Sequence, residues 1–353
     1  MPKLKFIDLF AGIGGTRLAA EANGLKCVFS SEIDNHCQQT YAANFGDMPS
    51  GDITKIPTSV IPNFDLLIAG FPCQPFSYAG DSLGLKDRRG NLFFELVRIL
   101  KEKKPKAFLF ENVKGLVSHD NGKTLKIIER ELNNIGYSFK WEILNSNDFG
   151  LPQNRERWYC VGFDTKKKIN LFNFPQKKIQ PKKLIDIIDK SLKDPSLKIS
   201  ELWQKRINWH FENIHEERVK HHDFGDKGSK RTQHGVFSFL KTDNSIRFHM
   251  GDFKKTQIQE GYFISTESDT APTLIAGRVP QLWDLKRKLS VKECARLQGF
   301  PDNYKFISPN SQSYKQLGNS VSVPVVKLIV KEICKILENS QNKNQKIEKQ
   351  LDF

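Results

Sequence analysis

Apolar and polar positions alternate along residues 1–165 in short blocks that predict strands and helices in turn. Apolar runs typical of strands lie at Leu4–Phe10, Cys27–Ser31, Asp65–Ala69, Ala107–Phe110, Phe139–Leu144 and Arg157–Phe163. Segments with apolar side chains at helical spacing lie at Thr16–Asn23, Asn91–Lys103 and Thr124–Asn134. Strands that alternate with helices are typical of an α/β fold around a mostly parallel sheet, and the last two strands are expected to be neighbours.

The pattern changes near residue 165, where periodicity weakens and lysine pairs mix with phenylalanines and prolines up to about residue 285. This texture predicts a second, loop-rich domain with a basic surface. Order returns at Ser290, which forms a helix capping-box pattern with Glu293. Pro324–Leu337 predicts a final helix with proline at its start. The tail from Asn339 is rich in Asn, Gln, Lys and Glu and is expected to be disordered.

The net charge of the chain indicates what kind of partner it binds. The formal net charge is +15, and residues 165–290 carry 25 Lys and Arg against 15 Asp and Glu. A balance this basic favours a polyanion, nucleic acid first, although solvated lysine faces would give the same composition. No apolar run approaches the roughly 20 residues of a membrane span. We therefore expect a cytoplasmic protein without a signal peptide or membrane contact.

One of the six cysteines stands apart from the rest. No cysteine forms a C-x-x-C pair or lies near a histidine at metal-ligand spacing, so no metal site is expected. Five cysteines fall in apolar periodic segments that are typical of core thiols. Cys73 instead lies in Gly70–Ser77, a segment stiffened by two prolines that follows a buried strand. Ligands of open α/β folds bind at the carboxyl ends of strands, so Cys73 is a candidate nucleophile.

A glycine-rich turn follows the first predicted strand at Asp8–Gly15. Glycines in such a turn let the backbone approach a ligand closely. Glu32 lies about 20 positions further on, where a carboxylate can bind ribose hydroxyls, and Asp52 follows the next short segment. The combination favours an adenosine-containing cofactor, and a tight strand–helix turn with nothing bound is the alternative.

Six motifs, in order and spacing, resemble the DNA (cytosine-5) methyltransferase family of bacterial restriction–modification type. They are Phe10–Gly15, Pro72-Cys73-Gln74, Glu111-Asn112-Val113, Gln153–Arg157, Arg296–Pro301 and Gln316–Val321. The resemblance implies a Rossmann-like S-adenosylmethionine-dependent methyltransferase fold with a mixed, mostly parallel sheet and a smaller irregular target-recognition domain. The expected boundaries are residues 1–175 and 315–338 for the catalytic and cofactor-binding domain, 176–314 for target recognition and 339–353 for the disordered tail.

The chemistry that the resemblance implies is covalent catalysis. Cys73 would add to C6 of cytosine as a thiolate, which makes C5 nucleophilic toward the methyl group of S-adenosylmethionine. Glu111 would protonate or hydrogen-bond N3. Arg155 and Arg157 are similar to the family's pair that holds the base, Cys73 and Glu111, with an unrelated ion pair as the alternative. The group that removes the C5 proton is not assigned.

The resemblance also implies ligand contacts. The cofactor residues would be Phe10, Ala11, Gly12, Ile13, Gly14, Gly15, Glu32, Ile33, Asp52, Ile53, Pro72, Leu92, Asn319 and Ser320. A loop at residues 77–89 would close over the flipped base, with a merely surface loop as the alternative. The candidate DNA contacts are Ser77, Arg88, Arg89, Arg231, Gln233 and Arg247. Thr273-Leu274 resembles a dipeptide near the end of the family's recognition region.

The expected partner is double-stranded DNA, bound by a monomer, and a cognate restriction endonuclease would act without a physical complex. A tRNA methyltransferase of the same fold is the first alternative, which Gln74–Ser77 disfavours because that segment follows the DNA branch. A non-catalytic DNA-binding regulator is the second, and intact Cys73, Glu111, Arg155 and Arg157 argue against it. A nicotinamide oxidoreductase would leave Cys73 without a role. The target sequence cannot be read from one chain.

Overall fold

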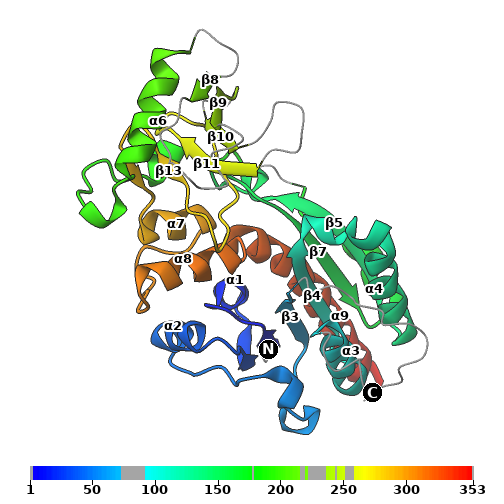
Figure 1. Cartoon of the computed structure of the whole chain (residues 1–353). Coiled ribbons are helices and arrows are strands. Elements are labelled where there is room, and N and C mark those ends of the chain that lie inside the picture. Colours follow the sequence, from blue (N-terminus) through cyan, green and yellow to red (C-terminus); the bar gives the residue numbers. More distant parts are fainter. Residues whose placement is uncertain are drawn as a thin grey trace.

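The computed structural model describes residues 3–72, 92–176, 179–214, 219–221, 236–242, 245–250 and 258–351. Within these ranges the chain forms a large sheet with helices on both faces and a smaller sheet at one end of the molecule (Figure 1). In the part of the chain covered by these ranges, no helix is both long and apolar enough to cross a membrane.

The large sheet has the strand order β2-β1-β3-β4-β7-β5. Its strands are β1 (Lys5–Leu9), β2 (Lys26–Ser31), β3 (Leu66–Gly70), β4 (Ala107–Val113), β5 (Ser138–Asn145) and β7 (Glu156–Phe163). The first four strands of the order run parallel, whereas β7 runs antiparallel to both β4 and β5. The prediction of a mixed, mostly parallel sheet is therefore confirmed, as is the pairing of its last two strands.

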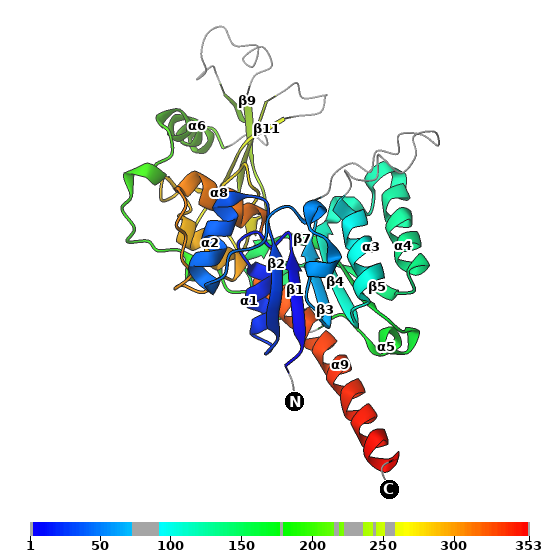
Figure 2. The same ribbon diagram turned by 90° about the horizontal axis from the view of Figure 1, so that it is seen from below.

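Both faces of the large sheet are buried because successive side chains of a strand point to opposite sides. In β1, Phe6 joins the core cluster under α1 (Gly15–Glu21) and α9 (Val323–Leu351), whereas Ile7 and Leu9 join the cluster under α3 (Leu92–Lys103) and α4 (Lys123–Asn134). Figure 2 shows α3 and α4 packed beside the strands and α9 leading away from the sheet. The chain thus has three layers, a sheet between two layers of helices. The helices cover the faces of the sheet and not the ends of its parallel strands.

The smaller sheet lies within the region that the sequence predicted to be loop-rich. It has the order β14-β13-β11-β10-β9-β8 and is mostly antiparallel. Its strands are β8 (Val219–His221), β9 (Val236–Leu240), β10 (Ile246–Met250), β11 (Ile258–Ile264), β13 (Gln281–Leu282) and β14 (Arg287–Lys288), and α6 (Glu201–Glu212) packs against them. Ile246, Phe248 and Phe263 form a small separate core with residues at 199 and 207. The strands β8, β13 and β14 are only two or three residues long, too short to produce a period in the sequence.

The remaining elements connect the two sheets. They are α2 (Asn35–Phe45), α5 (Lys166–Leu171), α7 (Val291–Gln298), α8 (Asn310–Asn319), and the paired strands β6 (Gln153–Asn154) and β12 (Ala271–Pro272). The capping box of α7 forms as expected, since the Glu293 N–H donates to Ser290 Oγ at 3.2 Å and the Ser290 N–H donates to the Glu293 carboxylate at 2.7 Å. The sequence had not predicted α2.

The end of the chain differs from expectation. Disorder was predicted from Asn339, but α9 continues to Leu351. Gln, Lys and Glu are good helix formers, and neither Gly nor Pro interrupts the segment, so the helix begun at Val323 has no signal to stop. The predicted boundary between the domains at residues 175–176 stays a prediction. Leu184, Leu282 and Leu289 belong to the same core cluster as Phe6, so the two regions share buried contacts.

Candidate active site

A pocket of about 490 Å³ lies at the carboxyl ends of the parallel strands. Its walls include Phe10, Ala11, Gly12, Ile13, Gly15, Glu32, Ile33, Asp52, Ile53, Pro72, Leu92, Asn319 and Ser320. These are all of the predicted cofactor residues except Gly14. Glu111, Arg155 and Arg157 line the same pocket, so the structure brings the predicted cofactor residues together with three of the four predicted catalytic residues.

The glycine-rich turn forms one wall of this pocket. Phe10 has a φ of 55° and Gly12 a φ of 54°, both in the left-handed region, so the chain reverses tightly between β1 and α1. Gly14 also has a positive φ, but a Cβ atom there would lie 2.3 Å from the Phe45 ring. Gly14 is therefore required for packing against α2, and it does not line the pocket.

Glu32 is fixed by the backbone on both sides. The Gly12 N–H donates to Glu32 Oε2 at 2.8 Å, and the Asp34 N–H donates to Glu32 Oε1 at 2.8 Å. Each carboxylate oxygen keeps a lone pair for a further donor, as binding a pair of ribose hydroxyls requires. Next to it, the side chain of Ile33 is 72 % exposed, which leaves a large apolar surface at the pocket wall.

Asp52 closes another side of the pocket and stays ionised. Its carboxylate accepts hydrogen bonds from the Thr54 hydroxyl and N–H, and these bonds lower the pKa of Asp52. Apolar Ile33 and Phe10, the fixed Glu32 and an anionic Asp52 offer an adenosine group a hydrophobic face and polar edges. The residues present therefore fit a cofactor such as S-adenosylmethionine.

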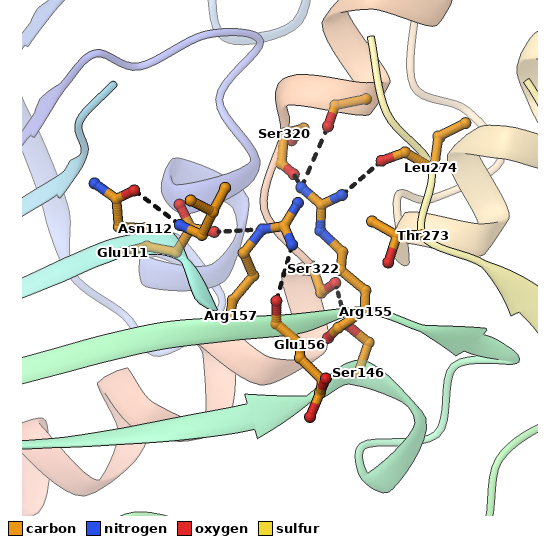
Figure 3. Close-up of polar contacts among 12 residues, drawn as sticks. Glu111, Asn112, Ser146, Arg155, Glu156, Arg157, Thr273, Leu274, Ser320 and Ser322 are labelled. Carbon is orange, nitrogen blue, oxygen red and sulfur yellow. Dashed lines mark hydrogen bonds and ion pairs between the residues drawn. The ribbon is translucent and has the colours of Figure 1, made fainter. Parts of the chain in front are cut away.

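Glu111 lies at the end of β4, directly beside the end of β3. It is opposite Gly70 in the parallel register, and a Cβ atom on Gly70 would lie 3.4 Å from Glu111 Oε2. From β7, Arg157 Nε approaches Glu111 Oε1 to 3.3 Å (Figure 3). Burial raises the pKa of Glu111, and the charges of Arg157 and Arg155 counteract only part of that effect. A carboxyl group with a raised pKa can carry a proton into the pocket.

Asn112, the next residue on β4, holds the backbone at Phe71, two residues before Cys73 in the sequence. Its Nδ2 donates to the Phe71 carbonyl at 3.0 Å, and its Oδ1 accepts from the Val113 N–H at 2.8 Å. Pro72, which follows Phe71, lines the pocket. In the sequence, Asn112 was recognised only as part of the motif Glu111-Asn112-Val113, and no role was predicted for it. The predicted residues Cys73, Ser77, Arg88, Arg89, Arg231 and Gln233 lie outside the described part of the chain.

Arg155 was expected to share the role of Arg157, but its contacts differ. Its side chain is 2 % exposed and donates to three backbone carbonyls, those of Leu274, Gly318 and Ser320 (Figure 3). Arg157 therefore makes the described ion pair with Glu111, and Arg155 joins distant parts of the backbone. The alternation of side chains along β7 and the segment before it could not predict the contacts of Arg155. Its acceptors are main-chain atoms of residues more than a hundred positions away.

Several pocket residues were missed by the sequence. Thr16 comes from the first turn of α1, Ser31 from the end of β2 and Asp34 from the N-cap of α2. Three more come from α8, namely Gln312, Lys315 and Gln316. Lys315 approaches Asp34 to 3.4 Å, which ties α8 to the pocket edge. Asp34 could have been predicted as a pocket residue, because it lies just after the end of β2, like Glu32. No local feature of the sequence indicated that α8 would line the pocket.

A second, smaller pocket of about 340 Å³, which we call the basic pocket, lies between the smaller sheet and the paired strands β6 and β12. Its walls include Asn154, Tyr262 and Thr273 and three cationic side chains, Lys241, Arg247 and Arg278. Arg247, a predicted DNA contact, lies over the Tyr262 ring at 4.6 Å from its centroid. No acidic side chain lines this pocket among the described residues. Its walls favour an anion.

Comparisons with known proteins agree with this arrangement. The family described as C-5 cytosine-specific DNA methylase matches residues 4–335. The chain is 40 % identical to the Type II methyltransferase M.DsaV of Dactylococcopsis salina over 97 % of this chain and 89 % of the relative. It is 39 % identical to the Type II methyltransferase M.HhaI of Haemophilus parahaemolyticus over 94 % of each.

Solved structures show the same fold. A Spodoptera frugiperda DNMT2 mutant matches with a TM-score of 0.67 at 20 % identity, covering 95 % of this chain and 99 % of that one. A putative DNA modification methyltransferase encoded within an Escherichia coli prophage matches with a TM-score of 0.65 at 22 % identity, covering 95 % of this chain and 100 % of that one. The family match spans both sheets and every predicted motif. The chain therefore belongs to the C-5 cytosine-specific DNA methylase family, and it is a DNA cytosine-5 methyltransferase of the restriction–modification type.

Proposed function

We propose that the enzyme methylates C5 of a cytosine that is flipped out of a specific short duplex sequence, with Cys73 as covalent nucleophile and S-adenosylmethionine as methyl donor. The observation that carries this proposal is the single pocket that holds the glycine-rich turn, Glu32, Glu111 and Arg157 together. A cofactor bound along the turn would lie beside a carboxyl group able to address the base.

The cofactor would lie between the turn and the end of β2. Glu32 would accept the ribose hydroxyls, Ile33 would pack on the adenine, and Asp52 would face its polar edge. S-adenosylmethionine supplies an electrophilic methyl group on a sulfonium centre. Asn319 and Ser320 would complete the site from the C-terminal end of α8.

The reaction at the base would use groups at the ends of β3, β4 and β7. The Cys73 thiolate would form a bond to C6, and the electron pair displaced from the C5–C6 bond would be drawn toward N3, where protonated Glu111 donates. The raised pKa of Glu111 favours this form. Arg157 would orient the carboxyl group and hydrogen-bond the base. After methylation, loss of the C5 proton would expel the thiolate and restore the ring.

Recognition of DNA is assigned to the smaller sheet and the basic pocket beside it. A target atom inside a stacked duplex must be extruded, at a cost of a few kcal/mol that contacts to the phosphates help to offset. Arg247 lines the basic pocket, and the net charge of +15 favours binding of a polyanion. We expect the enzyme to act as a cytoplasmic monomer that protects host DNA, with any cognate endonuclease acting separately.

Bisulfite sequencing of unmethylated DNA incubated with the purified enzyme and S-adenosylmethionine tests this function. Protected cytosines at one recurring sequence are expected, because methylation at C5 blocks bisulfite conversion. Modified adenine, methylation without sequence context or modification of tRNA alone would contradict it. A duplex with 5-fluorocytosine at the target should form a denaturation-stable adduct, since fluorine prevents the final elimination, and activity without such an adduct would refute covalent addition.

A further inference from the structure

We propose that Arg155 is a positioning residue that couples the binding of DNA to the binding of cofactor, because it holds the end of the recognition region against the loop that lines the cofactor pocket. We call Arg155 and the three carbonyls it binds the arginine clasp. The inference rests on the function proposed above, since it takes DNA and S-adenosylmethionine as the two ligands. It assigns to Arg155 a task separate from the chemistry at the base.

The clasp joins two segments that are far apart in the sequence. Arg155 Nη1 donates to the Leu274 carbonyl at 2.7 Å, and Nη2 donates to the Ser320 carbonyl at 2.6 Å and to the Gly318 carbonyl at 3.3 Å (Figure 3). The planar guanidinium presents its donors in a fixed fork, so one side chain satisfies carbonyls on both sides.

Each of the two segments borders a different pocket. Thr273 and Ile275, on either side of Leu274, line the basic pocket beside the smaller sheet. Gly318, Asn319 and Ser320 line the pocket predicted to hold the cofactor. A ligand in either pocket would therefore contact a segment that Arg155 binds.

The two segments also touch through their backbones. A Cβ atom on Gly318 would lie 2.3 Å from the Ala276 nitrogen and 2.4 Å from the Ile275 carbonyl carbon. Only glycine permits this approach, because these contacts are with main-chain atoms that cannot rotate away. A displacement of either segment must be transmitted to the other, as in a close-packed interior.

Two glutamines reinforce the junction. The Leu274 N–H donates to Gln153 Oε1 at 2.9 Å, and Gln153 Nε2 donates to Gln298 Oε1 at 3.1 Å. Gln298 Nε2 in turn donates to the Leu317 carbonyl at 2.8 Å. The clasp is thus part of a buried polar network that runs from the recognition region to the end of α8.

Burial makes the clasp an all-or-none contact. Burial, with the charge of Arg157, lowers the pKa of Arg155 to about 10, so the guanidinium remains charged. If one segment moved away, charged N–H donors and backbone carbonyls would be left buried without partners, which is costly. The two segments therefore hold their positions together or separate together, and a ligand that stabilises one position favours the other.

The test measures the affinity of the enzyme for a duplex carrying its target, identified by bisulfite sequencing, with and without saturating S-adenosylhomocysteine. In the wild type, the second ligand should tighten DNA binding by roughly 5- to 150-fold, the usual range of coupling between sites. Arg155→Lys keeps the charge but loses the fork, and it should reduce this factor at least about five-fold toward one. Gly318→Ala, which wedges the segments apart, should do the same.

Arg287→Lys is the matched control. Arg287 is also buried, at 6 % exposure, and donates to Glu293 and to the Asp189 carbonyl, but it lines neither pocket. This variant should lose stability and keep the wild-type coupling factor. A full coupling factor in folded Arg155→Lys and Gly318→Ala enzymes would overturn the clasp, as would an equal loss in Arg287→Lys.

A measurement on the unmodified enzyme avoids dependence on variants that fold poorly. S-adenosylhomocysteine alone should slow hydrogen exchange of backbone amides in residues 271–280, although these residues do not line the cofactor pocket. Unchanged exchange there, with protection at the glycine-rich turn, would overturn the coupling. If the enzyme neither methylates DNA nor binds S-adenosylhomocysteine, the proposed function itself fails. Methylation without coupling rejects only the clasp.

Discussion

The two pockets described above differ in the balance of their charges. The larger one, at the end of the parallel strands, mixes the carboxylates of Glu32, Asp52 and Glu111 with Arg155 and Arg157. The smaller one, beside the antiparallel sheet, contains Lys241, Arg247 and Arg278 and no acidic side chain among the described residues. Paired charges suit precise chemistry on a small group, whereas unbalanced cations suit a polyanion. The proposed function places catalysis in the larger pocket and the attraction of DNA in the smaller one, and each part of the proposal can be tested separately.

Replacement of the nucleophile should give the largest effect. We expect Cys73→Ala to lose methylation by about 10⁴-fold or more, since removing a covalent nucleophile commonly costs this much. Binding of S-adenosylhomocysteine and of DNA should stay close to wild type, because neither the turn nor the basic pocket is altered. Turnover measured with radiolabelled cofactor, alongside calorimetric binding, checks both. Substantial residual turnover in this variant would contradict the covalent mechanism.

Glu111→Gln should lower kcat by roughly 10²- to 10³-fold, because proton donation to N3 is lost. Glu95→Gln is a close control: both carboxylates are 14 % exposed and paired with an arginine, but Glu95 pairs with Arg98 on α3, outside the pocket. The control should retain activity while losing a little stability. Equal losses of kcat in the two variants would mean that the Glu111–Arg157 pair is only structural.

A variant of the basic pocket should change binding and leave the chemistry intact. Arg247→Ala is expected to weaken DNA binding about ten-fold and, if the contact is a phosphate, to reduce the salt slope by about one. The maximal rate at saturating DNA should change little. Lys101→Ala, on the exposed surface of α3, removes the same charge at a distance from both pockets and should have a much smaller effect. A reversed ranking of the two variants would contradict the division between the pockets.

The smallest expected effect concerns stability near the cofactor turn. Asp8 is fully buried beneath it, and burial raises the pKa of its carboxyl group from 3.8 to about 7, partly opposed by the hydrogen bond from Thr16. A raised pKa means that the stabilisation is complete below pH 3.8 and is lost as the pH rises through about 7.

Asp8→Asn should therefore flatten the fall of the melting temperature between about pH 4 and 7, by a few degrees at most. Thermal unfolding of both proteins across this range provides the check. A parallel pH dependence in wild type and variant would show that Asp8 is not the group that titrates.

Much of the large sheet could be predicted from the sequence because its signals are local. Each parallel strand is a short apolar run, and the candidate site residues Glu32 and Glu111 lie just beyond β2 and near the end of β4, where the fold places ligands. The smaller sheet could not be predicted in this way. Its strands pair mainly with their neighbours in the sequence and bury one small core around Phe248 and Phe263, and three of them are only two or three residues long. Apolar and polar residues do alternate along Ile246–Met250, but one strand of five residues is a weak signal within a polar region.

The sequence by itself determined the family and the α/β fold, and it predicted the chemical types at the candidate catalytic site, because the candidate nucleophile, the candidate acid and the glycine-rich turn lie in short motifs. Tertiary structure alone decided how the two arginines divide their tasks. Arg155 and Arg157 are two positions apart, but one side chain contacts Glu111 and the other binds carbonyls of Leu274, Gly318 and Ser320. Backbone carbonyls exist at every residue and leave no mark in a sequence, so only the folded chain shows which of them a buried guanidinium binds.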